Sequence, residues 1–421
     1  MSHLTKKIFL TVILSVLTSF CLCLTSSQGV FAQAKKPIKV GYVDTMSGPF
    51  GSSGTEGLKG FKMAAEEINA MGGILGRAIE VLVEDDEVKT EIAARKARKL
   101  ILENKVELLH GVSTTGGTLA LNEIATQYKV LHINSEADGV ATLKGMSPYN
   151  LNTGLYTHEA GLAMVLALME KYPRKDIKRW FMWLEDTAFG HELTDAVKEA
   201  VKKYLPEAEI VGEDVHPLGE KDFSTRISKA LATNPQVMCN TDWLADVATF
   251  VRQAKPYGFF EKVPIFLSGG YSTDTMTTLG KEMVPCDALV FSCNPFIPEN
   301  QDFFNKFVKR YNDIPKFEYV GGYYDALYLY KTGVERSKSF DPLKITKALA
   351  NSKVKLPATG EITITKFHTT VVNWVGVASF KYDERWGVYT PRDLVKVPGQ
   401  KLELTSQDAI RYGCKWCETV K

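Results

Sequence analysis

A run of small hydroxyl residues is the first candidate for ligand chemistry in this sequence. Ser113, Thr114 and Thr115 follow a short apolar segment and are themselves followed by Gly116. Hydroxyl groups and free backbone N–H groups at the start of a helix form a favourable seat for a carboxylate or another negative oxygen. We therefore expect Thr114, Thr115 and Gly116 to bind an acidic group of a small ligand. The alternative is a plain helix N-cap at Thr115 or Thr118 without a ligand.

Two aromatic side chains occupy comparable positions, each after a strand-like segment. Phe189 follows the segment Trp180–Leu184, and Trp243 follows the segment Gln236–Asn240. Each ring alone could equally belong to a hydrophobic core. Together they favour a ligand with an apolar or aromatic surface, because small-molecule pockets are lined mainly by such side chains.

The sequence lacks the common motifs for catalysis, metal binding and cofactor binding. It contains no Gly-x4-Gly-Lys-Ser/Thr phosphate loop, and the segment around Ser113 lacks the second glycine of a nucleophile elbow. Neither His158 nor His191 is followed by a second histidine at the spacing of a helical zinc site. We therefore predict no catalytic residues, no metal site and no cofactor.

Strand-like and helix-like patterns alternate along most of the chain and must position these residues. Ile38–Asp44 has the pattern of a buried strand, and the apolar positions from Leu58 to Ile68 recur at helical spacing. The alternation starts again near His158, and the tail from Glu361 onward is rich in strand-forming residues. This order predicts parallel sheets with helices on both faces. A chain of 421 residues is too long for one ordinary core, so we expect two domains.

The N-terminus has the pattern of a secretory signal peptide. Lys6 and Lys7 precede the apolar run Ile8–Leu24, and the segment that follows ends in small residues at Ala32. We expect cleavage after Ala32, so that residues 1–32 are removed and the protein is exported. A retained membrane anchor is the alternative, because the apolar run is close to the minimum length for a span.

The charge and the cysteine content of the chain restrict the classes of binding partner and the possible disulfide bonds. The chain has 51 Lys and Arg against 49 Asp and Glu and no basic run, which argues against nucleic acid or an anionic membrane surface as the main partner. An odd number of cysteines follows the signal peptide, so at least one thiol stays unpaired within the monomer. The pair Cys414 and Cys417 either closes on itself or joins the tail to Cys286 or Cys293.

A helix followed by a glycine-rich turn carries a resemblance to a known family. Residues 64–76 have the sequence Ala-Ala-Glu-Glu-Ile-Asn-Ala-Met-Gly-Gly-Ile-Leu-Gly. This segment resembles the first helix and turn of type I periplasmic binding proteins, typified by the branched-chain amino acid receptors of ABC transporters. Three later segments are similar to the same family and occur in the same order: residues 221–224, 321–326 and 341–349. The resemblance covers essentially the whole mature chain.

The resemblance implies an α/β fold of two Rossmann-like lobes joined by three hinge crossings. One lobe would comprise residues 33–154 and 294–371, and the other would comprise residues 155–293 and 372–421. The cleft between the lobes would lie outside the carboxyl ends of the strands, where open α/β sheets bind ligands.

The resemblance also implies further residues at the cleft. They are Ser135, Glu136, Ala137, Asp138, Gly270, Tyr271 and Tyr319, with Pro49, Phe50 and Ser53 in a loop near the cleft. The amino acid receptors of the family usually carry an acidic residue near Gly270 to hold the ligand ammonium, and this sequence has none there. A bound ammonium would then depend on Asp138 or Glu136. The combination favours a small carboxylate or amide with an aromatic or aliphatic body, with a branched-chain amino acid as the second choice.

The function implied is that of a periplasmic, non-catalytic solute-binding protein. Such a receptor closes on its ligand by a hinge motion and delivers it to the membrane permease of an ABC transporter. An exported sensory receptor of the same fold is the alternative, and a secreted α/β enzyme is a third, remoter possibility.

Overall fold

The computed structural model describes residues 35–420, apart from Pro49, residues 136–139, Leu155, Tyr271 and Leu404. The expected signal peptide lies outside the described residues. From Pro37 onward the chain forms one compact unit. Within the described part of the chain, no helix combines the length and the apolar composition needed to cross a bilayer.

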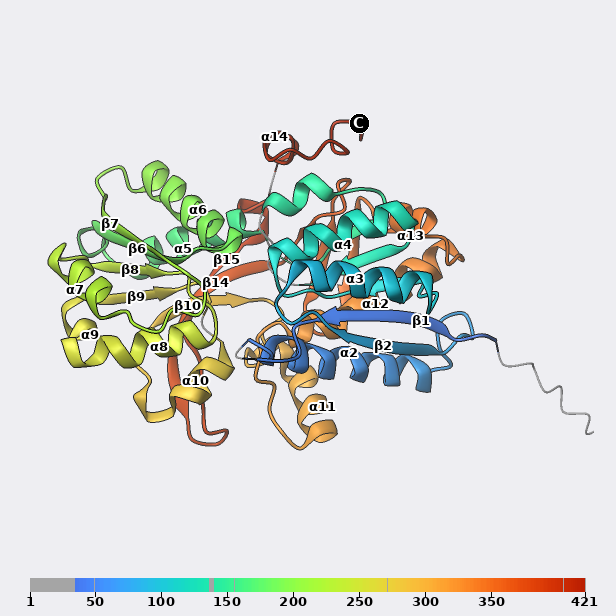
Figure 1. The fold of residues 1–421 in the computed structure, drawn as a ribbon, viewed down its shortest axis with the longest axis horizontal. Coiled ribbons are helices and arrows are strands. Elements are labelled where there is room, and N and C mark those ends of the chain that lie inside the picture. The colour runs from blue at the N-terminus through green and yellow to red at the C-terminus, as the bar shows by residue number, and fades with distance from the viewer. Residues whose placement is uncertain are drawn as a thin grey trace, which may run out of the picture. The chain divides into compact units, whose positions relative to one another are not determined.

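A five-stranded parallel sheet forms the centre of the first lobe (Figure 1). Its strands lie in the order β2-β1-β3-β4-β5. The strands are β1 (Ile38–Asp44), β2 (Ile79–Asp85), β3 (Leu108–His110), β4 (Leu131–Asn134) and β5 (Asn150–Asn152). The helices between them are α2 (Ser52–Ala70), α3 (Thr90–Leu102) and α4 (Thr115–Tyr128).

Alternating side chains of β1 explain why helices cover both faces of this sheet. Val40 and Tyr42 belong to the hydrophobic cluster that includes Phe61 of α2. Val43 points to the other face and belongs to the cluster that includes Leu100 of α3. Successive residues of a strand face opposite sides, so an uninterrupted apolar strand needs a helical layer on each side.

A seven-stranded sheet forms the centre of the second lobe, in the order β15-β14-β10-β9-β8-β6-β7. The strands β6 to β10 run parallel, whereas β14 pairs antiparallel with both β10 and β15. The bounds are β6 (Arg179–Glu185), β7 (Glu209–His216), β8 (Val237–Asn240), β9 (Ile265–Ser268), β10 (Asp287–Phe291), β14 (Trp374–Asp383) and β15 (Val388–Pro398).

Helices again cover both faces of the second sheet. Trp180 of β6 lies in the cluster that contains Leu193 of α6, whereas Trp183 lies in the cluster that contains Phe250 of α8. Figure 1 shows α5 and α6 on one side of this sheet and α7 to α9 on the other. The helices are α5 (Thr157–Lys171), α6 (Ala188–Tyr204), α7 (Ser224–Ala232), α8 (Ala245–Ala254), α9 (Phe259–Lys262) and α10 (Thr273–Leu279).

The chain passes between the two lobes three times. It leaves the first sheet between β5 and α5, returns between β10 and α11, and leaves again between β13 and β14. The returning segment packs against α2 through α11 and α12. It comprises α11 (Gln301–Tyr311), α12 (Val320–Ser337) and α13 (Pro342–Leu349), followed by a small antiparallel sheet of β11 (Ser352–Leu356), β12 (Gly360–Ile364) and β13 (Thr370–Val371). The residue-level lobe boundaries given above remain a prediction.

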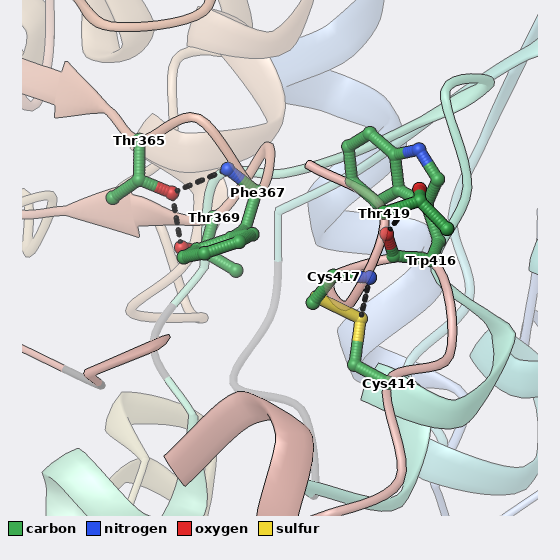
Figure 2. Close-up of a disulfide and its surroundings, with 7 residues drawn as sticks. All are labelled: Thr365, Phe367, Thr369, Cys414, Trp416, Cys417 and Thr419. Carbon is green, nitrogen blue, oxygen red and sulfur yellow. Dashed lines mark hydrogen bonds between the residues drawn. A yellow bond between two sulfur atoms is a disulfide. The ribbon is translucent and has the colours of Figure 1, made fainter. Parts of the chain in front are cut away.

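The last described residues, 405–420, form what we call the C-terminal clasp. The clasp contains α14 (Ser406–Arg411) and a disulfide between Cys414 and Cys417 (Figure 2). The terminal pair therefore closes on itself, and the alternative of a bond to Cys286 or Cys293 is wrong. Those two thiols and the thiol of Cys239 are free and buried.

Contacts of the clasp reach elements of both lobes. Cys414 and Cys417 are buried with Leu143, Met146 and Phe367 of the first lobe. On the second lobe, Arg411 pairs with Glu199 of α6 at 3.0 Å, and the Tyr412 hydroxyl lies 3.1 Å from Nδ1 of His158 on α5.

Candidate functional site

A cavity of about 220 Å³ lies at the carboxyl ends of strands from both sheets. This volume is far larger than the ~10–15 Å³ that one water molecule needs, so the cavity accommodates a small organic molecule. Seven of the residues predicted from the sequence line it: Thr114, Thr115, Gly116, Phe189, Trp243, Gly270 and Tyr319. Ser113, which belongs to the same predicted hydroxyl run, lines it as well. The remaining lining residues were not predicted: Val88, Thr90, Glu185, Thr187, Ala188, Leu218, Gly269 and Glu318.

The N-terminus of α4 forms one wall of the cavity. Thr114 is the N-cap, and its Oγ1 accepts a hydrogen bond of 3.2 Å from the Gly117 N–H. The cap is therefore Thr114, and the alternative was wrong in placing it at Thr115 or Thr118. Thr115 and Gly116 are instead the first helical residues, where the helix dipole is positive.

A buried acid holds this wall in place. Asp44, the last residue of β1, accepts hydrogen bonds from the Ser113 N–H at 2.9 Å, from the Ser113 hydroxyl and from the Tyr323 hydroxyl at 2.7 Å. Burial raises the pKa of Asp44 to about 6, although the hydrogen bonds from Ser113 and Tyr323 oppose the rise. The Ser113 hydroxyl also lies 3.0 Å from the Ser53 hydroxyl, which places the predicted Ser53 behind the wall, outside the set of residues that line the cavity.

An aromatic contact joins the two lobes beside the cavity. Phe50 lies in the loop between β1 and α2, and Trp243 follows β8 of the second lobe. Their rings stack with centroids 5.4 Å apart and planes 11° from parallel. The predicted Phe50 therefore acts by packing on Trp243, because it does not itself line the cavity.

A second helix N-terminus faces the cavity from the other lobe. Thr187 is the N-cap of α6 and accepts a hydrogen bond of 3.0 Å from the Gly190 N–H. Phe189, in the first turn of this helix, is half-buried and lines the cavity. Close packing shapes the neighbouring loop as well, since a Cβ atom at Gly270 would lie 2.1 Å from the Asp242 carbonyl oxygen.

Two glutamates that were not predicted from the sequence line the cavity. Glu185 ends β6, and Glu318 precedes α12; they are only 2% and 8% exposed. The Oε2 atom of each has no hydrogen-bond partner. Burial raises the pKa of Glu318 to about 8. Burial, together with the nearby charges of Asp242 and Asp246, raises the pKa of Glu185 well above its usual range.

A buried network behind Glu185 is fully paired. Asp242 accepts hydrogen bonds from Trp183 Nε1 at 2.9 Å and from Asn240 Nδ2 at 3.0 Å, and its Oδ1 lies 2.9 Å from His216 Nε2. Burial lowers the pKa of His216, but its contacts with Asp214 and Asp242 outweigh that effect and raise the pKa to about 9. The imidazolium charge is therefore already balanced by two carboxylates.

Other predicted residues lie outside this cavity. Ser135 lines a separate space of about 20 Å³, and its hydroxyl lies 2.9 Å from that of Thr153. Tyr324, in the helix that follows Tyr319, is buried and donates a hydrogen bond to Glu67 at 2.6 Å. The remaining predicted residues lie outside the described residues: Pro49, Glu136, Ala137, Asp138 and Tyr271.

Two α/β lobes, three chain crossings and a cavity lined from both sides define a type I periplasmic binding protein, a two-lobed receptor for small molecules. The family described as periplasmic binding protein matches residues 37–380 of this sequence. The chain belongs to this family, which confirms the expected fold and the resemblance.

Individual relatives agree with this assignment. The chain is 26% identical over 345 residues to Leu/Ile/Val-binding protein homolog 7 of Brucella abortus (strain 2308), with 78% of this chain and 84% of the relative covered. It is similar in fold to a leucine-binding protein from Thermotoga maritima MSB8, with a TM-score of 0.74, 20% identity and coverage of 85% and 98%. It is also similar in fold to an ABC transporter solute-binding protein from Rhodopseudomonas palustris BisB5 in complex with 3,4-dihydroxybenzoic acid, with a TM-score of 0.75, 22% identity and coverage of 86% and 98%.

Proposed function

We propose that this chain is the extracytoplasmic solute-binding protein of an ABC transporter and works by binding, not by catalysis. The observation that carries the proposal is a cavity of about 220 Å³ lined by both lobes, with Phe50 stacked on Trp243 across them. A ligand that contacts both walls stabilises the closed arrangement over the open one, which is how such receptors signal occupancy to a permease.

The cavity wall at α4 supports an acidic head group for the ligand. Thr114, Thr115 and Gly116 present hydroxyls and first-turn amides, and such a helix N-terminus stabilises negative oxygen atoms. Phe189, Trp243 and Tyr319 supply the apolar surface for the body of the molecule. The named ligands of the relatives, Leu/Ile/Val and 3,4-dihydroxybenzoic acid, both combine a carboxylate with such a body.

A ligand screen with a matched variant tests this function. Purified protein is screened against amino acids and small organic acids by thermal unfolding and by tryptophan fluorescence. A true ligand stabilises the folded state by about 2.7 kcal/mol at a hundredfold excess over Kd, and the melting temperature therefore rises. Trp243→Ala should abolish the response. Turnover of the bound compound on prolonged incubation, or an unchanged response in Trp243→Ala, would contradict the proposal.

Export is the second part of the proposed function. The basic and apolar N-terminal pattern supports cleavage after Ala32 and delivery to the periplasm. Intact mass measurement of protein recovered from the periplasm decides this, because a cleaved chain starts at Gln33. A mass that retains residues 1–32 would show that the N-terminus is an anchor instead.

A further inference from the structure

The C-terminal clasp covers the hinge between the two lobes. Its buried cluster includes Tyr156, which lies in the first crossing, between β5 and α5. The ring of Trp416 packs on that of His368, with the centroids 4.7 Å apart. His368 lies in the loop between β12 and β13, just before the third crossing, and its Nδ1 is 3.1 Å from the Asn150 carbonyl oxygen of β5. The clasp therefore packs on the chain beside two of the three crossings.

Contacts with two helices of the second lobe extend the clasp across the hinge. The Tyr412 hydroxyl lies 3.1 Å from Nδ1 of His158 on α5, and the two rings have centroids 5.9 Å apart. Arg411 pairs with Glu199 of α6 at 3.0 Å. Each contact is weak by itself, because exposed ion pairs and single hydrogen bonds contribute little. Both nevertheless join the clasp to the lobe opposite its buried cluster, so they favour the arrangement in which the lobes are close together.

A disulfide fixes the shape of the clasp. Cys414 and Cys417 are separated by two residues, the spacing of disulfides that exchange with dithiols. Sγ of Cys414 accepts a hydrogen bond of 3.2 Å from the Cys417 N–H (Figure 2), and such a donor also favours the thiolate that reduction forms. The other cysteines of the described chain, Cys239, Cys286 and Cys293, are free. Among the described residues, a reductant therefore acts on one bond, at the cover of the hinge.

We propose that the clasp is a redox-sensitive strap across the hinge: with the bond between Cys414 and Cys417 intact it stabilises the closed arrangement, and reduction releases the strap and favours opening. The inference rests on the proposed function, because a strap matters only in a receptor whose lobes open and close. It also goes beyond that function. The family match ends at residue 380, so the clasp lies outside the part of the chain that matches the family.

The reductant that this step requires is a dithiol. One dithiol sulfur attacks a clasp sulfur, releases the other cysteine and forms a mixed disulfide; the second dithiol sulfur then releases the remaining cysteine. The dithiol loses two electrons and two protons and becomes a disulfide, and Cys414 and Cys417 become two thiols. Both cysteines are buried, so the attack needs local opening of the clasp, whose helix α14 is short and largely exposed.

Hydrogen exchange on the ligand-free protein tests the strap. The protein is compared with and without dithiothreitol, and alkylation with mass measurement identifies the cysteines that are reduced. Opening should expose the cavity walls, so peptides that contain Thr115 and Trp243 should exchange about threefold faster or more after reduction. Faster exchange confined to residues 405–420 means that the clasp frays without moving the lobes, and it overturns the proposal. A bond that dithiothreitol leaves intact in the folded protein overturns it as well.

Variants connect the effect to the clasp. The double variant Cys414→Ser, Cys417→Ser should match the reduced protein and should not respond to dithiothreitol. Tyr412→Phe removes the hydroxyl contact with His158 and should give a smaller change in the same peptides. Tyr257→Phe is the matched control, because it removes a hydroxyl from an exposed tyrosine of the second lobe and should be silent. Should the double variant fail to fold, the comparison of the oxidised and reduced wild type still decides.

Binding measurements separate this inference from the proposed function. The probes are L-leucine and 3,4-dihydroxybenzoate, because one relative is described as a Leu/Ile/Val-binding protein homolog and one similar structure contains 3,4-dihydroxybenzoic acid. A probe that binds should bind about fivefold tighter to the oxidised than to the reduced protein. Equal affinities overturn the strap and leave the receptor function intact. If the whole ligand screen finds no binder, the receptor function fails, and hydrogen exchange alone decides the strap.

Discussion

Asp44 and Glu185 occupy equivalent places in the two lobes, since each is the last residue of an interior strand. Their surroundings differ completely. Asp44 accepts hydrogen bonds from Ser113, Tyr323, Tyr42 and the Thr45 N–H. Glu185 receives one long hydrogen bond and leaves a buried oxygen unpartnered. A strand-end acid that is saturated supports the wall of a site, whereas an unsaturated one is available to whatever enters it.

The largest expected effect is on folding stability. Asp44→Ala removes the acceptor for several buried donors and should lower the free energy of unfolding by about 3–5 kcal/mol. Glu185→Gln removes no such acceptor and should change stability by less than about 1 kcal/mol. Urea unfolding at neutral pH, followed by circular dichroism, measures both. Equal losses would show that the two acids do the same structural work.

A pH dependence should distinguish Glu318 in the ligand-free protein. Burial raises its pKa from the usual 4.5 to about 8, so between these values the folded state holds a proton that the unfolded state has lost. The wild type should therefore lose stability as pH rises from about 5 to 8, and Glu318→Gln should remove that part of the loss. By pH 8 the variant should gain of the order of 2–4 kcal/mol relative to the wild type.

Thermal unfolding of both proteins in the presence of denaturant, across this pH range, measures the difference. As a control, Glu209→Gln changes an exposed residue at the start of β7 and should follow the wild-type curve throughout. Parallel curves for Glu318→Gln and wild type would mean that Glu318 is not the group responsible. The charged group that acts on Glu318 is Asp274. The thiol of Cys293 lies nearby, 3.7 Å from the Glu318 backbone carbonyl oxygen, but it is neutral in this pH range because burial raises its pKa.

Two adjacent threonines at α4 should separate structure from binding. Thr115→Val keeps the helix cap and should weaken a carboxylate-bearing ligand by roughly 1–3 kcal/mol. Thr114→Val removes the cap and should lower the free energy of unfolding by about 1 kcal/mol. Calorimetric titration and urea unfolding of the same two variants give both numbers. If Thr115→Val leaves affinity unchanged, the acidic group of the ligand lies elsewhere.

The smallest predicted effect concerns the aromatic contact between the lobes. Phe50→Ala removes a stacked pair worth about 0.5–1.5 kcal/mol. Because this contact joins the two lobes around the cavity, its loss should weaken ligand binding by a similar amount. A double-mutant cycle with Trp243→Ala measures the coupling between the two rings. A coupling energy near zero would show that the stack does not contribute to closure.

Most of the fold was predictable because its elements obey simple periodicities. The alternation of Ile38–Asp44 corresponds to β1, and the helical spacing from Leu58 to Ile68 falls within α2. The helix α10 was missed because its sequence, Thr-Asp-Thr-Met-Thr-Thr-Leu, is polar and rich in residues that favour caps and turns. Its stability depends on the Ser272 cap and on packing against α8, which no local pattern contains.

Site residues that directly follow a strand could be predicted from the sequence. Site residues that tertiary packing brings to the cavity could not. Thr115 and Trp243 were found because parallel strands direct the residues that follow them to one edge of a sheet. Glu185 carried the same signal, since it directly follows the predicted strand that ends at Leu184, but a glutamate is rarely buried and no pattern marks the exceptions. Glu318 follows no strand and reaches the cavity only because α12 packs on α2, a tertiary contact without a sequence signature.

The C-terminal clasp has a consequence for how motion of this receptor can be observed. Its ion pair with the second lobe, Arg411 with Glu199, is exposed and contributes little, whereas Cys414 and Cys417 are buried mostly among residues of the first lobe. Tyr412 adds a partly buried contact with His158 of α5. When the lobes separate, the exposed ion pair should break first, and we expect the chain terminus to move with the first lobe, which supplies Leu143, Met146 and Phe367 to the buried cluster. A fluorescent dye attached after residue 420, paired with a second dye on α6, would therefore report the change in distance between them each time the receptor opens or closes.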